Sequence, residues 1–151
     1  MKLWLLVLLP LLLGAALLQE GDSVTPVSLP DQFDEQHNIG SERYWIIAWD
    51  RETTRIANFF FEKHYSLLTR KHAALLVDVS QTPSGIMSLF VMPRMQSYEH
   101  PILLSADETY NLTLPYQDGK LTVLTLKEGR IEAVAFAADG EELGRLLKEP
   151  F

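Results

Sequence analysis

The sequence contains no cysteine. Disulfide bonds, thiol–disulfide exchange and thiolate catalysis are therefore excluded for this chain, and so is a lipid anchor attached through cysteine. Positive charge is also scarce, since 13 Lys and Arg residues stand against 20 Asp and Glu residues, a net charge of −7. Nucleic-acid binding depends on clustered Lys and Arg, so we expect no nucleic-acid partner, and an anionic membrane surface is disfavoured for the same reason.

Recognisable catalytic motifs are missing as well. No serine lies in a G-x-S-x-G context, and no G-x-G-x-x-G follows a predicted strand. No two histidines share an H-x-H, H-x-x-x-H or H-E-x-x-H spacing; the four are His37, His64, His72 and His100. We therefore expect no cofactor, no metal and no catalytic residue of a known pattern. Enzymatic activity stays open, but a binding role is favoured.

The N-terminal residues 1–16 have the composition of a secretory signal. Lys2 precedes a leucine-rich run, and the small residues at 14–16 predict cleavage after Ala16. The apolar run Leu3–Leu18 is shorter than the roughly 20 residues that a membrane-spanning helix needs. The sequence therefore predicts an exported protein without membrane contact after cleavage. The alternative is a retained anchor, which would suit an accessory subunit of an envelope complex.

The rest of the chain has the length of one domain. Residues 17–40 contain prolines, alternate in polarity and close at Gly40, which is typical of an extended arm or a short hairpin. Residues 41–151 are expected to form the domain itself. Within it, the apolar runs 43–49 and 73–80 predict strands that are covered on both faces.

Between these strands the apolar spacing becomes helical from Thr53 onward, and Asp50 is placed as its N-cap. Later segments predict, in order, a short helix, a third strand, an exposed excursion, a β-hairpin and a closing helix; these cover residues 83–92, 101–106, 107–119, 120–137 and 139–148. This order predicts an α/β fold with a mixed central sheet and helices on both faces.

Several stretches in this order resemble the thioredoxin superfamily. "IIAWDRET" is similar to the strand that enters the W-C-x-x-C motif, with Trp49 at the tryptophan and Asp50 and Thr53 where the two cysteines stand. "VDVSQTP" resembles the V-D-V-x-x-x-P end of the next strand. "SLPDQFDEQHNI" resembles the N-terminal segment of periplasmic thiol–disulfide and peroxiredoxin-like proteins. The resemblance spans residues 26–148 and implies a thioredoxin-like fold and the periplasm of a Gram-negative bacterium.

The resemblance also implies a binding groove. His100-Pro101 stands where the family has its cis-proline, in a loop that faces the start of the helix. Backbone beside that proline pairs with an extended peptide, a mode of recognition that needs no cysteine. The implied function is a redox-inactive protein that binds a protein or peptide partner of the cell envelope; the groove residues are Trp49, Asp50, Arg51, Thr53, His100 and Pro101.

Two carboxylates allow more than one interpretation. Asp50 is either a helix cap at the former thiol position or the acid–base group of a small-substrate enzyme, with His100 as its partner. Asp78 lies in a buried-looking strand and is either a carboxylate with a shifted pKa or a residue at the solvent edge of the strand.

Overall fold

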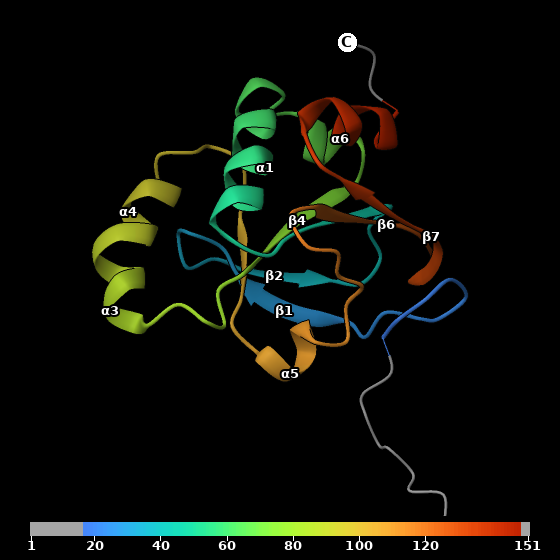
Figure 1. Ribbon diagram of the computed structural model, residues 1–151, viewed down its shortest axis with the longest axis horizontal. Coiled ribbons are helices and arrows are strands. Elements are labelled where there is room, and N and C mark those ends of the chain that lie inside the picture. The colour runs from blue at the N-terminus through green and yellow to red at the C-terminus, as the bar shows by residue number, and fades with distance from the viewer. Residues whose placement is uncertain (1–16, 149–151) are drawn as a thin grey trace, which may run out of the picture.

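We describe the protein over residues 17–148 of a computed structural model (Figure 1). The predicted signal, residues 1–16, lies outside the described residues. The centre of the fold is a five-stranded sheet in the order β5-β4-β3-β6-β7. Its strands are β3 (Tyr44–Ala48), β4 (Ala73–Asp78), β5 (Leu103–Ser105), β6 (Leu121–Lys127) and β7 (Arg130–Ala137). β3, β4 and β5 are parallel, whereas β6 runs antiparallel to β3 and β7 antiparallel to β6.

Six helices and one π-helical turn are described besides the sheet. They are α1 (Arg51–Lys63), α2 (Leu67–Arg70), α3 (Ser84–Ile86), the π-helical turn Met87–Val91, α4 (Met92–Met95), α5 (Glu108–Asn111) and α6 (Gly140–Leu146). The helix predicted over 83–92 is thus extended by α4, and the predicted excursion 107–119 contains the short helix α5. None of the helices within residues 17–148 has the length and apolar character needed to span a bilayer.

The N-terminal arm forms a hairpin. β1 (Val27–Pro30) pairs antiparallel with β2 (Gln36–Ile39), apart from the main sheet. Its side chains Leu29 and Ile39 are buried against the central sheet. The hairpin therefore serves as a cover for one face.

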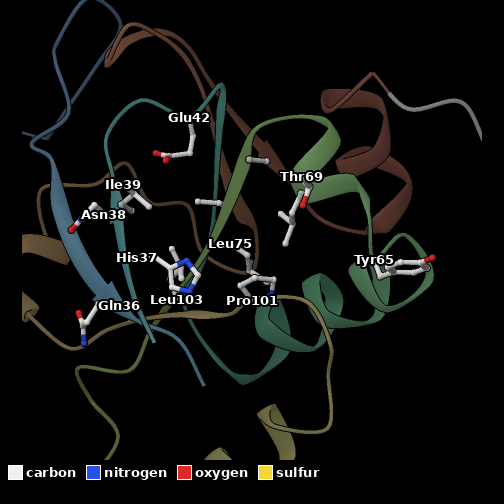
Figure 2. A pocket seen from close by; sticks show the side chains of 13 residues that line it. Gln36, His37, Asn38, Ile39, Glu42, Tyr65, Thr69, Leu75, Pro101 and Leu103 are labelled. Carbon is white, nitrogen blue, oxygen red and sulfur yellow. The ribbon is translucent and has the colours of Figure 1, made fainter. Parts of the chain in front are cut away.

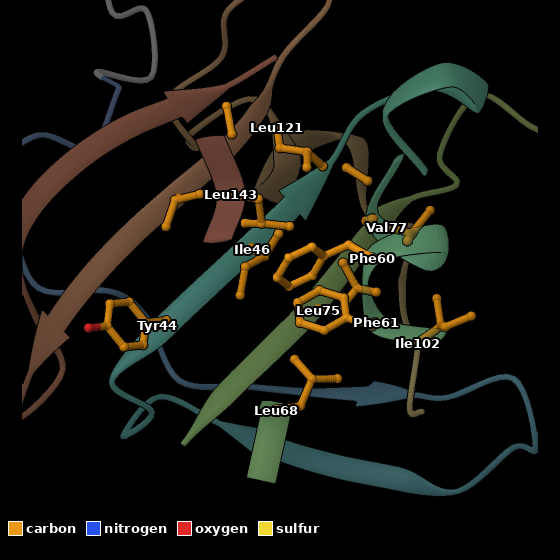
Figure 3. Packing of buried hydrophobic residues seen from close by; sticks show 14 of the residues in the cluster. Tyr44, Ile46, Phe60, Phe61, Leu68, Leu75, Val77, Ile102, Leu121 and Leu143 are labelled. Atoms are coloured by element: carbon orange, nitrogen blue, oxygen red, sulfur yellow. The ribbon is translucent and has the colours of Figure 1, made fainter. Parts of the chain in front are cut away.

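The core consists of two apolar layers, one on each face of the sheet. On one face, Phe60 and Phe61 of α1 and Leu143 of α6 pack against strand residues such as Ile46 and Leu75 (Figure 3). The other face is covered by the β1–β2 hairpin and the α5 region, on the opposite side of the sheet in Figure 1. All five residues of β3 are buried because the strand lies between both layers. The predicted mixed sheet flanked by helices is confirmed.

Candidate functional site

The start of α1 follows directly from the end of β3. The Asp50 carboxylate accepts hydrogen bonds from the Thr53 N–H at 2.8 Å and the Thr53 hydroxyl at 2.9 Å. In return, Thr53 Oγ1 accepts from the N–H groups of Asp50, at 3.1 Å, and Trp49, at 2.9 Å. This capping box is formed by Asp50 and Thr53, and the predicted N-cap is confirmed.

Exposure differs sharply within this short segment. Thr53 is fully buried, while Asp50 and Arg51 are exposed and Trp49 is half-buried. The polar atoms of Thr53 are therefore bound inside the helix start and do not face solvent. Trp49, Asp50, Arg51 and the exposed Glu52 can contact another molecule here.

The loop ahead of β6 lies against this helix start. Trp49 Nε1–H donates to Thr122 Oγ1 at 2.9 Å, and the Thr122 hydroxyl donates to the Pro115 carbonyl at 2.7 Å. The Trp49 and Tyr116 rings meet edge to face, with centroids 5.3 Å apart. A hydrogen bond to Asp118 raises the pKa of the half-exposed Tyr116, and the negative charge of Asp50 adds to the shift.

His100 lies away from Asp50. Its Nε2–H donates to Asn58 Oδ1 at 2.9 Å, and its ring contacts Tyr98 and Phe61. Asn58 is eight residues further along α1 than Asp50, which corresponds to about 12 Å of helix. The structure therefore does not form the Asp50–His100 pair that an acid–base mechanism needs.

The buried state of His100 has an electrostatic consequence. The residue is 2% exposed, and burial lowers its pKa to about 4. Within residues 17–148, its Nδ1 is the one buried side-chain nitrogen or oxygen that has no hydrogen-bond partner. A proton on Nδ1 would have no acceptor, so the imidazole is neutral at physiological pH.

Pro101 lies at the other end of the sheet from the helix start. It precedes β5, which is parallel to β3, so it is near the amino ends of the parallel strands, whereas α1 begins at their carboxyl ends. No peptide bond among residues 17–148 is cis, so the expected cis-proline at His100-Pro101 is wrong. The loop that faces the helix start is instead the one before the antiparallel strand β6. The six predicted groove residues thus fall into two separate groups.

The carboxyl ends of β4 and β5 hold a polar cluster that the sequence analysis did not predict. Asp78 Oδ1 accepts from the Ser80 N–H at 2.9 Å, the Ser80 hydroxyl at 2.6 Å and Asn111 Nδ2 at 2.8 Å. Asn111 Nδ2 also donates to the Ser105 carbonyl at 3.1 Å, and the Ser105 hydroxyl donates to Asn111 Oδ1. Asp78, half-buried at the strand end, therefore fastens α5 to the sheet. This role depends on a hydrogen bond between residues that are 33 positions apart, so no local pattern indicates it.

A second unpredicted cluster lies in the hairpin loop. Ligand-type atoms of Asp31, Glu35 and His37 lie within 4.8 Å of one another, a set that could hold a cation. Asp31 already accepts from His37 at 2.7 Å and from the N–H groups of Phe33 and Glu35. Burial alone would raise the pKa of Asp31, but these hydrogen bonds outweigh it and lower the pKa. The bonds shape the loop.

No protein-family model and no curated protein sequence matches the chain. Solved structures do. Peroxidoxin BcpB from Mycobacterium tuberculosis is 15% identical, with a TM-score of 0.57 over 85% of this chain and 94% of that one. A putative thiol:disulfide interchange protein DsbE from Chlorobium tepidum is 15% identical, with a TM-score of 0.58 over 87% and 96%. StoA from Bacillus subtilis is 13% identical, with a TM-score of 0.56 over 83% and 98%. These likenesses establish the fold.

Proposed function

We propose that this thioredoxin-like chain, which lacks both cysteines of the CxxC motif, is an exported, redox-inactive protein that binds a protein or peptide partner of the cell envelope. The observation that carries the proposal is the capping box between Asp50 and Thr53. A helix N-terminus favours a thiolate because its N–H groups and dipole stabilise negative charge. Here the Asp50 carboxylate, as the helix cap, supplies the negative charge at the start of α1. The junction between β3 and α1 is therefore present without redox chemistry.

The binding surface that we propose adjoins this cap. It keeps Trp49, Asp50 and Arg51, with Thr53 as the buried support of the turn, and it adds Tyr116 from the facing loop. His100 and Pro101 no longer belong to it, because they lie elsewhere in the fold. Aromatic and arginine side chains are enriched where proteins bind one another. The edge-to-face Trp49–Tyr116 pair provides a rigid apolar contact beside one charge of each sign.

Crosslinking from the proposed surface tests the function. A photo-reactive amino acid at Arg51, in cells that export the protein, is expected to give a discrete adduct. Tyr116→Ala should remove that adduct, whereas Tyr116→Phe, which keeps the ring, should retain it. A photo-reactive residue at the exposed Glu62 of α1 provides the control position. Equal adducts from both positions, or an adduct indifferent to Tyr116→Ala, would contradict the proposal.

Export is tested separately by N-terminal sequencing of the protein recovered from cells. A mature chain beginning at Leu17 in the periplasmic fraction is the expected result. An intact N-terminus in the membrane fraction would favour the anchored accessory subunit instead.

A further inference from the structure

The outer edge of β4 is only partly covered. β5 pairs with Leu76–Asp78 and does not reach the first three residues of the strand. Ala73–Leu75 are paired with β3 on their inner side and have no strand partner on the outer side. Since Pro101 has no N–H, the chain ahead of β5 cannot extend the ladder with a full set of hydrogen bonds.

Strand geometry shows which backbone groups point to this uncovered edge. The Val79 N–H donates to the Ser105 carbonyl at 3.0 Å, so residue 79 faces the β5 side. Successive residues of a strand alternate in the direction of their N–H and C=O groups. The N–H and C=O of Ala73 and the N–H of Leu75 therefore point away from β3. Ala73 is partly exposed there, whereas Leu75 is 1% exposed.

A cavity of about 510 Å³ opens at this edge. Gln36, Asn38 and Ile39 of β2 lie on one side of it, and Tyr65 and Thr69 lie on the other (Figure 2). The unpaired part of β4 lies between these two sides. The volume of the cavity is in the range of ordinary ligand clefts. The unpaired segment of β4 has three residues, which span about 10 Å in an extended chain.

The two sides of the cavity differ in chemistry. Leu68 and Leu75 belong to the apolar layer under α1, and the exposed Tyr65 also lines the cavity. The opposite side carries the amide and imidazole groups of Gln36, His37 and Asn38. An added strand directs alternate side chains to opposite faces of the sheet. This cavity therefore suits an extended peptide that alternates apolar and polar side chains.

We propose that the uncovered edge of β4 binds an extended peptide segment of another protein as an added strand. Unpaired N–H and C=O groups at a sheet edge are a template for such pairing. A second copy of this chain is a poorer occupant, because each copy carries a net charge of −7 and its own edge lies between a hairpin and α2. The site does not depend on the proposed function, since about 13 Å of strand separates it from the start of α1.

The absence of cysteine makes a selective test possible. A single thiol introduced by Ser66→Cys, next to α2, would carry acetyl-Thr-Val-Thr-Val-Thr on a short flexible linker in the full-length protein. Such a tether gives an effective concentration in the millimolar range, so weak pairing becomes populated. NMR hydrogen exchange of the Ala73 and Leu75 amides is the readout. We expect both amides to exchange at least about tenfold more slowly with the tethered peptide.

Two matched controls define the mode of binding. The same peptide with N-methylated amides cannot donate hydrogen bonds and should give no slowing. Thr69→Trp, which fills the cavity, should abolish the slowing, whereas Glu62→Trp on the exposed face of α1 should not. Unchanged exchange, or equal slowing by the N-methylated peptide, overturns the proposal. Slowing that rises with protein concentration in the absence of peptide assigns the edge to a second copy and also overturns it.

The test separates this inference from the proposed function. If the crosslink at Arg51 is absent while the tethered peptide still protects Ala73 and Leu75, only the proposed function fails. If the crosslink is found and protection is not, only the strand-addition site fails.

Discussion

The two ends of the parallel strands β3, β4 and β5 differ in whether their polar groups are hydrogen-bonded within the protein. At the carboxyl ends, the Asp50–Thr53 capping box and the Asp78–Asn111 cluster each form hydrogen bonds among their own polar groups. At the amino ends, the backbone of Ala73 and Leu75 faces a cavity without a partner strand. The carboxyl ends are therefore internally hydrogen-bonded, whereas the amino ends leave backbone groups of β4 without a partner strand.

His100 gives the largest expected effect. Its pKa falls from 6.5 to about 4 on folding, so the unfolded chain binds the proton first. The free energy of unfolding attributable to His100 is therefore unaffected above pH 6.5 and decreases as the pH falls toward 4, by roughly 3 kcal/mol in total. Urea unfolding of the protein and of His100→Gln across this range measures the effect.

The matched control for this pH dependence is His64→Gln, which removes a less buried histidine. This variant should retain the decrease in unfolding free energy at low pH that His100→Gln loses. The lowered pKa of Asp31 acts only below about its ordinary value of 3.8, outside this window. If the free energy of unfolding depends on pH equally in both variants, the prediction that His100 is buried and neutral is wrong.

Asp78→Ala should disrupt the hydrogen-bonded cluster at the carboxyl ends of β4 and β5. The change removes the acceptor of both Ser80 groups and one of the two acceptors of the buried Asn111 side-chain amide, and we expect about 2 kcal/mol of destabilisation by chemical denaturation. Asp78→Asn keeps an acceptor oxygen and should cost less. A loss below about 0.5 kcal/mol for Asp78→Ala would show that this cluster does not fasten α5.

Asp50→Ala tests the helix cap at the same end. Loss of an N-cap costs typically about 1 kcal/mol, and Asp50→Ser, which can still accept from the Thr53 N–H, should recover most of it. Thermal unfolding of the two variants side by side measures the difference. Equal melting of Asp50→Ala and Asp50→Ser would mean that the carboxylate is kept for another purpose.

A substitution beside the amino ends of the parallel strands should change the stability of the protein least. Tyr65 is 66% exposed, so Tyr65→Ala should change the free energy of unfolding by less than about 0.5 kcal/mol. The same variant should weaken protection by the tethered peptide, because Tyr65 lines the cavity. A large loss of stability, with peptide protection unchanged, would remove the contrast between the two ends.

Local features of the fold were predictable from the sequence. The buried runs at 43–49 and 73–80, the helical spacing after Thr53 and the hairpin at 120–137 all correspond to observed elements. Asp50 was correctly assigned as an N-cap because capping depends on residues three positions apart. Such features depend on neighbours in the sequence, so residue patterns carry them.

The predicted groove combined residues that the structure places at opposite ends of the parallel strands, because that part of the prediction depended on strand direction. Pro101 directly precedes an apolar run, whereas Pro115 is separated from the strand β6 by a polar turn, and nothing local shows that Pro101 leads into a strand parallel to β3 while Pro115 leads toward the antiparallel β6. The choice of Pro101 followed from that ambiguity. The one available signal was that the sequence from 120 onward forms a hairpin, whose first strand can pair next to β3.

The absence of thiol chemistry, the α/β class and the helix capped by Asp50 follow from residue types and short spacings in the sequence. Only the tertiary structure decided which loop faces that helix, how His100 is buried against Asn58 and that β5 stops short of Ala73. These depend on the direction, register and length of strands that meet from distant parts of the chain, and no local spacing specifies them.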